Sequence, residues 1–153
     1  MGSFRGDFTE MLVASGVARR LSPDDCRSLE AVLSSELPWT GCHLSWHSLA
    51  GSTSFEWGQK SEAEAGSFLR ELALYRCPDV TLLYSRTEGL RVTSFWLAGH
   101  LIEASCNAQQ FFGIGGSATE PDLSTVAEFE TASVIWGMLP NPGLQRAGLT
   151  PGR

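Results

Sequence analysis

Two segments near the start of the chain repeat their hydrophobic residues every three or four positions, which is the period of an amphipathic helix. The first helix is expected over residues 7–20. The second has clearer end signals, with Ser22 in the N-cap position, Pro23 in the first turn and Pro38 as the stop. The pattern therefore predicts that the fold opens with two helices.

A third helix and five strands are predicted over the middle of the chain. The helix is expected to run from Ser61 to about Arg76, and Ser61 and Glu64 have the spacing of a capping box. The last three strands are expected to form a meander that turns at glycine residues. Alternating apolar and polar residues predict strands over 41–49, 52–57, 80–86, 90–98 and 100–106.

The last third of the chain is predicted to contain a loop, a helix and a tail. Residues 111–116 are rich in glycine and are expected to form a mobile loop. A helix is expected to begin near Asp122, and residues 132–136 suit a helix and a strand equally well. Residues 140–153 contain three prolines and three glycines, so we expect a disordered tail there.

These elements predict one α+β domain over residues 1–139. Their order is α-α-β-β-α-β-β-β-α, and a mainly antiparallel, five-stranded sheet would carry the helices on at least one face. This order resembles the profilin-like and roadblock-type topologies. The resemblance lies in the order of elements, without a shared motif, and it implies a fold only.

Charge and cysteine content narrow the choice of partner and compartment. The chain has 17 acidic and 11 basic residues, a net charge of −6 and an isoelectric point near 5.0. Nucleic-acid-binding surfaces are basic, so the acidic charge argues against a nucleic-acid partner. No apolar run approaches the roughly 18 residues that a membrane-spanning helix needs. The four cysteines form no Cys-x-x-Cys pair, and no secretory signal opens the chain. We expect a cytoplasmic protein that binds neither nucleic acid nor a membrane.

The three histidines predict no metal or catalytic centre. On the expected strand over 41–49, alternation places Cys42 in the core and both His43 and His47 on the opposite, solvent-facing side. Four residues of strand separate these histidines by roughly 13 Å, which is too far to share a metal ion. His100 lies in an expected turn. We therefore expect no catalytic residue, no metal and no cofactor, and the protein is not predicted to be an enzyme.

Acidic and aromatic residues near the end of the domain predict a binding surface. The segment from Glu120 to Glu130 has four carboxylates and no basic residue, and two phenylalanines precede it in the glycine-rich loop. Aromatic side chains beside acidic ones are typical of protein-binding surfaces. The alternatives are solvated acids that serve solubility and aromatics that fill a small core beneath the loops. The partner-binding residues predicted in this way are Phe111, Phe112, Glu120, Asp122, Glu128, Glu130 and Trp57.

A small, acidic and aromatic-rich chain of this kind favours a non-enzymatic, protein-binding domain. The narrower hypothesis is a bacterial, cytoplasmic immunity protein that neutralises a toxin, because an acidic inhibitor associates quickly with a basic partner. A second hypothesis is a roadblock- or profilin-like adaptor that works as a homodimer. A third is a small enzyme or ligand-binding domain whose pocket, between the sheet and the last helix, recruits His100, Tyr84 and Glu103.

Overall fold

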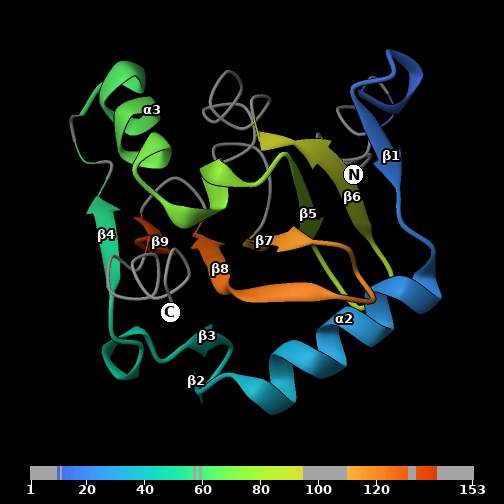
Figure 1. Cartoon of the computed structure of the whole chain (residues 1–153), viewed down its shortest axis with the longest axis horizontal. Coiled ribbons are helices and arrows are strands. Elements are labelled where there is room, and N and C mark those ends of the chain that lie inside the picture. Colours follow the sequence, from blue (N-terminus) through green and yellow to red (C-terminus); the bar gives the residue numbers. More distant parts are fainter. Residues whose placement is uncertain are drawn as a thin grey trace, which may run out of the picture.

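The computed structural model describes residues 10, 12–56, 58, 60–94, 110–130 and 134–140. Its centre is a seven-stranded sheet with the order β1-β6-β5-β7-β8-β9-β4, in which every neighbouring pair is antiparallel (Figure 1). The strands are β1 (Ala18–Arg20), β4 (Ser52–Glu56), β5 (Asp79–Leu83), β6 (Gly89–Thr93), β7 (Phe111–Gly116), β8 (Pro121–Phe129) and β9 (Val134–Met138). The chain is therefore an α+β protein with a larger sheet than the five strands expected.

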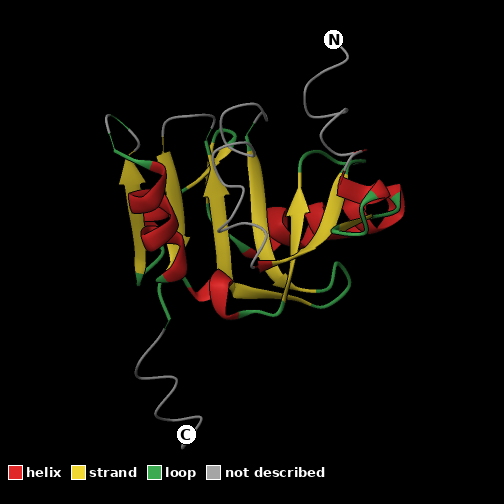
Figure 2. Cartoon of the chain, turned by 90° about the horizontal axis from the view of Figure 1, so that it is seen from above, coloured by secondary structure: helices red, strands yellow, loops and turns green. Residues whose placement is uncertain are grey.

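The remaining elements lie against this sheet. A short antiparallel hairpin is made by β2 (Trp39–Thr40) and β3 (His43–Leu44). The helical elements are α2 (Pro23–Glu36), α3 (Glu62–Arg70) and the 3₁₀ turns η1 (Trp46–Ser48) and η2 (Ala73–Arg76). Helices α2 and α3 lie on opposite sides of the sheet (Figures 1 and 2). Each face of the sheet therefore has its own hydrophobic core.

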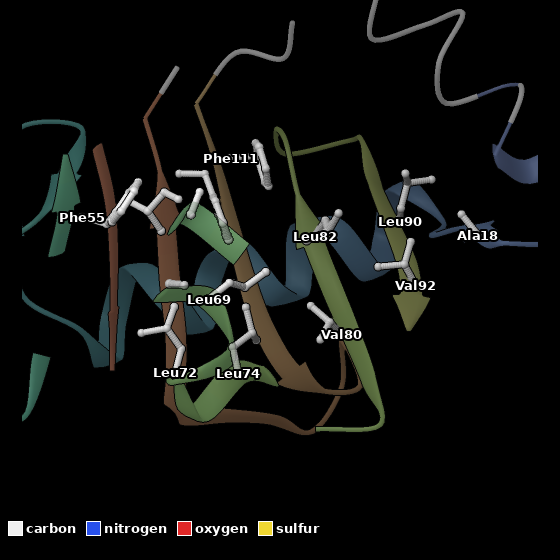
Figure 3. Close-up of a cluster of buried hydrophobic side chains, with 14 of the residues drawn as sticks. Ala18, Phe55, Leu69, Leu72, Leu74, Val80, Leu82, Leu90, Val92 and Phe111 are labelled. Carbon is white, nitrogen blue, oxygen red and sulfur yellow. The ribbon is translucent and has the colours of Figure 1, made fainter. Parts of the chain in front are cut away.

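The first core lies beneath α3 and η2. Leu69 of α3, Leu74 of η2 and Leu72 between them pack toward inward-facing residues of the strands, among them Val80 and Leu82 (Figure 3). All five of these side chains are fully buried. Because strand residues alternate between faces, Leu83 points away from this cluster and joins the second one.

The second core lies between the sheet, α2 and the segment that contains the hairpin and η1. Helix α2 contributes Cys26, Leu29 and Leu33, and the following segment contributes Leu44 and Trp46. This packing places the hairpin and η1 against residues of β7, β8 and β9.

Both local cap predictions are confirmed. Ser22 accepts a hydrogen bond from the backbone N–H of Asp25, and Pro23 opens helix α2. Ser61 and Glu64 form the expected capping box at the start of α3. That helix is shorter than predicted, because it ends at Arg70 and is followed by η2. The hydrogen bonds of both caps join residues three positions apart, so they form whatever the rest of the fold is.

The predictions for residues 111–138 are largely wrong. Residues 111–116 form strand β7 instead of a loop, and strand β8 stands where a helix was expected from Asp122. Residues 125–129 are buried on both faces of the sheet, so the sequence shows no alternation there. The glycines of β7 reflect close packing: a Cβ on Gly115 would lie 2.3 Å from Cys77 Sγ.

The predicted strand over 41–49 is also wrong. Only two of its residues are in β3, and η1 follows with Trp46 buried. Cys42 lies in the turn of the hairpin and is exposed, whereas a core position was expected. The helix expected over 7–20 ends early, because residues 18–20 form β1 and pair with β6.

Several predictions fall on residues that the structure does not describe. Strands β5 and β6 pair as the first two strands of the expected meander. The third strand, over 100–106, lies outside the described residues, as do Trp57, His100, Glu103 and the tail over 141–153.

Candidate functional site

The centre of the site is Glu128, a carboxylate that strand β8 holds with no exposed surface. It lies on the face of the sheet that carries the second core, between Phe112 of β7 and Trp136 of β9 in the strand register. A charged side chain in such a place needs hydrogen bonds to compensate for its lost hydration. Each of its oxygens has such partners.

Glu128 Oε1 is held by donors from the segment that crosses the sheet. The backbone N–H of Leu44 donates to it at 3.1 Å, and Trp46 Nε1 donates at 2.9 Å. The donor residues are 4% exposed, so water cannot replace the carboxylate as their acceptor. Glu128 therefore fixes the hairpin and η1 to strand β8.

Glu128 Oε2 is held by two side chains nearer the surface. His43 Nδ1 lies 2.5 Å from it, and Gln110 Nε2 donates to it. Gln110 Nε2 also donates to the carbonyl oxygen of Cys42 at 3.1 Å, which ties the turn of the hairpin to the start of β7. The hydrogen bond with Glu128 raises the pKa of His43, and the negative charges of Glu128 and Glu130 act in the same direction. Desolvation opposes this rise in pKa.

A second carboxylate stands beside this pair. Glu130 Oε2 lies 4.0 Å from His43 Nδ1 and accepts a hydrogen bond from Trp136 Nε1 at 3.0 Å. Trp136 in turn stacks on Trp46, with ring centroids 5.9 Å apart and planes at 10°. Each of two stacked indoles thus donates its N–H to one of the two carboxylates.

Next to this cluster, a cleft of about 610 Å³ opens between α2, the hairpin and the end of β5. The surface of its lining is largely hydrophobic. Trp39 forms one wall: its indole N–H donates to the carbonyl oxygen of Leu33, and its ring meets that of Phe112 edge to face at 5.5 Å. The lining residues are Glu30, Leu33, Ser34, Trp39, Gly41, Cys42, Leu83, Tyr84, Ser85, Arg86 and Phe112.

The charges near the cleft are unevenly distributed. Glu30 and Arg86 lie across from each other, with 3.6 Å between Glu30 Oε1 and Arg86 Nε. Helix α2, which forms one wall, carries four acidic residues and one arginine. Within the lining, the charge of Arg86 opposes that of Glu30, and the other acids of α2 lie outside the lining.

The structure separates the residues that the sequence grouped into one binding surface. Phe112 lines the cleft, but Phe111 is 1% exposed and belongs to the core on the opposite face. Glu120 and Asp122 are exposed, and they lie at the opposite end of β8 from Glu128. Six residues, or roughly 20 Å of strand, separate Asp122 from Glu128. The expectation that Glu128 is solvated is wrong.

Sequence reasoning did not anticipate the contribution of the hairpin to the site. His43 was expected on a solvated strand face, and it bonds a buried carboxylate instead. Gln110 and Arg86 gave no signal, because ordinary surface residues have the same appearance in a sequence. Of the aromatic walls, Phe112 was among the predicted partner-binding residues, and Trp39 stands directly after the predicted stop of a helix.

No helix among the described residues is long and apolar enough to cross a membrane. Comparisons of the chain with protein-family models, with curated proteins and with solved structures find no match. The geometry defines an α+β domain with a largely apolar cleft beside a partly buried His–Glu cluster.

Proposed function

We propose that this protein is a non-enzymatic binding domain that holds apolar side chains of a partner protein in the cleft beside α2. The observation that carries this proposal is the cleft itself. Its volume of about 610 Å³ has room for several side chains. Aromatic walls such as Trp39 and Phe112 are the groups that most often anchor protein interfaces.

The net charge of the chain favours a basic partner. In the cleft itself Glu30 is paired with Arg86, so the attraction comes from the other acids of α2 and from the chain as a whole. With a net charge of −6, the chain as a whole attracts basic proteins and raises their rate of association. The narrower proposal is that the partner is a toxin domain and that this protein is its cytoplasmic immunity protein.

Two neighbouring serines of α2 provide a sharp test of the cleft. Ser34 and Ser35 are both exposed, but only Ser34 lines the cleft. Ser34→Arg places a long, positive side chain at the opening, whereas Ser35→Arg adds the same charge to the same helix outside it. Proteins captured from native lysate by the unmodified chain would be identified by mass spectrometry, purified, and titrated against both variants by calorimetry.

The expected result is that Ser34→Arg weakens binding at least tenfold and that Ser35→Arg changes it little. Equal binding by both variants would move the interface away from the cleft. If native mass spectrometry shows that the purified protein retains a small apolar molecule, the cleft is a ligand-binding site and the proposal of a protein partner is wrong.

The role of the surface acids is tested separately by kinetics. Neutralising the exposed pair, with Glu120→Gln and Asp122→Asn, should slow association and weaken its dependence on salt if these acids steer the partner. Stopped-flow measurements at two salt concentrations give both quantities. An unchanged association rate would leave these acids with a role in solubility only.

A further inference from the structure

His43, Glu128 and Glu130 form a group that the sequence disperses over two distant segments. His43 lies on β3, Glu128 near the end of β8, and Glu130 just after it. One ligand atom from each, a ring nitrogen and two carboxylate oxygens, lie within 4.8 Å of one another. The earlier expectation of no metal compared the histidines only with each other and so did not test this group.

We propose that these three residues bind a divalent transition-metal cation of the Zn²⁺ type, with His43 Nδ1 and one oxygen of each glutamate as ligands. Imidazole and carboxylate groups bind Zn²⁺ at about 2.0–2.2 Å, which places ligand atoms roughly 3–4 Å apart around one ion. The 4.0 Å between His43 Nδ1 and Glu130 Oε2 already satisfies this requirement. The hydrogen bond between His43 and Glu128 opens by about 1 Å when the ion replaces its proton.

Both carboxylates are already oriented by groups outside the ligand set. The N–H groups of Leu44 and Trp46 hold Oε1 of Glu128, and Oε2 faces His43. Gln110 Nε2 also donates to Oε2 and lies 3.1 Å from His43 Nδ1, so this amide turns aside when an ion binds. Trp136 holds the carboxylate of Glu130. Metal sites commonly use such secondary hydrogen bonds to fix their ligands, and their loss typically lowers metal affinity.

The local charge also favours a cation. Two carboxylates face one histidine, and one of them has no exposed surface. Among the ion pairs of the described residues, neither carboxylate is paired with lysine or arginine. A protonated His43 balances one of these negative charges, whereas a divalent ion bound to neutral His43 balances both.

The site is open enough for exchange with solvent. The side chains of His43 and Glu130 are 45% and 29% exposed, so water can complete the coordination of an ion. Bound there, the ion would join the hairpin to β8. Because the hairpin forms one wall of the cleft, metal binding would also stabilise the shape of that wall.

The test uses the whole chain, treated with a chelator. It is titrated with ZnCl₂ by calorimetry and heated with and without Zn²⁺. We expect one Zn²⁺ per chain and a higher melting temperature with the ion. His43→Ala and Glu130→Gln should each lower affinity at least tenfold, since even loss of a secondary partner costs about 10–100-fold. Both replaced side chains are partly exposed, so circular dichroism should show folded variants.

Matched controls decide between this site and adventitious binding. His47→Ala removes a nearby histidine, Glu120→Gln an exposed acid, and Cys42→Ser the exposed thiol beside His43. All three should retain the affinity of the unmodified chain. Three results would each overturn the proposal: the chain does not bind Zn²⁺, it still binds Zn²⁺ with unchanged affinity after His43→Ala or Glu130→Gln, or its binding requires Cys42.

Discussion

Removal of the Glu128 side chain should strongly destabilise the folded protein. In Glu128→Ala the backbone N–H of Leu44 and the indole N–H of Trp46 lose their acceptor in a place that water does not reach. Each unsatisfied buried donor costs about 1–3 kcal/mol, so the two together cost about 2–6 kcal/mol. The contact with His43 adds less, because that side chain is 45% exposed and solvent screens it. We expect a loss of about 3–5 kcal/mol, against a total stability of about 5–15 kcal/mol for such a domain.

Urea unfolding followed by tryptophan fluorescence, with a chelator present, measures this loss directly. Glu128→Gln is the matched variant, because its remaining oxygen can still accept hydrogen bonds from Leu44 and Trp46. Its free energy of unfolding should exceed that of the alanine variant by at least about 1 kcal/mol. Glu120→Ala removes an exposed acid and should change stability by no more than about 0.5 kcal/mol. A loss below about 1 kcal/mol for Glu128→Ala would refute the view that this carboxylate secures the hairpin and η1 to the sheet.

Three further predictions concern proton binding, strand packing and thiol exposure. Because the folded protein raises the pKa of His43, its interaction with Glu128 contributes fully below the unfolded value of about 6.5 and is lost as pH rises through the folded pKa. In the presence of a chelator, the stability difference between the unmodified chain and His43→Gln should therefore shrink from about pH 6 to pH 8, and a difference that grows would contradict the assignment. Gly115→Ala should lower the free energy of unfolding by about 1–3 kcal/mol, because its Cβ would meet Cys77 Sγ at 2.3 Å. In a double-mutant cycle, Cys77→Ala should recover part of that loss of stability. Strictly additive losses from the two substitutions would contradict the contact. In a Cys106→Ser background, the exposed Cys42 should react with a thiol reagent well before Cys26 and Cys77. Those two cysteines are buried or half-buried, and burial raises the pKa of each thiol. Cys42→Ser should abolish the fast phase of the reaction. A fast phase that survives this change would contradict the exposure of Cys42.

The sequence by itself was sufficient for elements whose signals are local. The cap of α2 joins Ser22 to Asp25, and the capping box of α3 joins Ser61 to Glu64, so each depends on residues three apart. The hairpin of β5 and β6 was also predicted, because a short turn brings adjacent strands together. The α+β class followed from these elements and from the alternation in the middle of the chain.

Only the tertiary structure decided the extent of the sheet. Strand β8 is buried on both faces where it lies beneath α3, η2 and η1, so its sequence has no period of two. Strand β7 is rich in glycine because Cys77 and Leu74 pack closely against it, and the same glycines are typical of a loop. Burial by distant elements thus removed the pattern on which a sequence prediction depends.

The candidate site was beyond the reach of the sequence for the same reason. His43 and Glu128 are 85 positions apart, and their environments were each predicted to be solvent. A charged residue in a strand is ordinarily on the surface, and it becomes buried only when donors from elsewhere in the fold compensate for its lost hydration. Here Leu44, Trp46 and Gln110 provide those donors, and the packing of the hairpin over β8 determines where they lie.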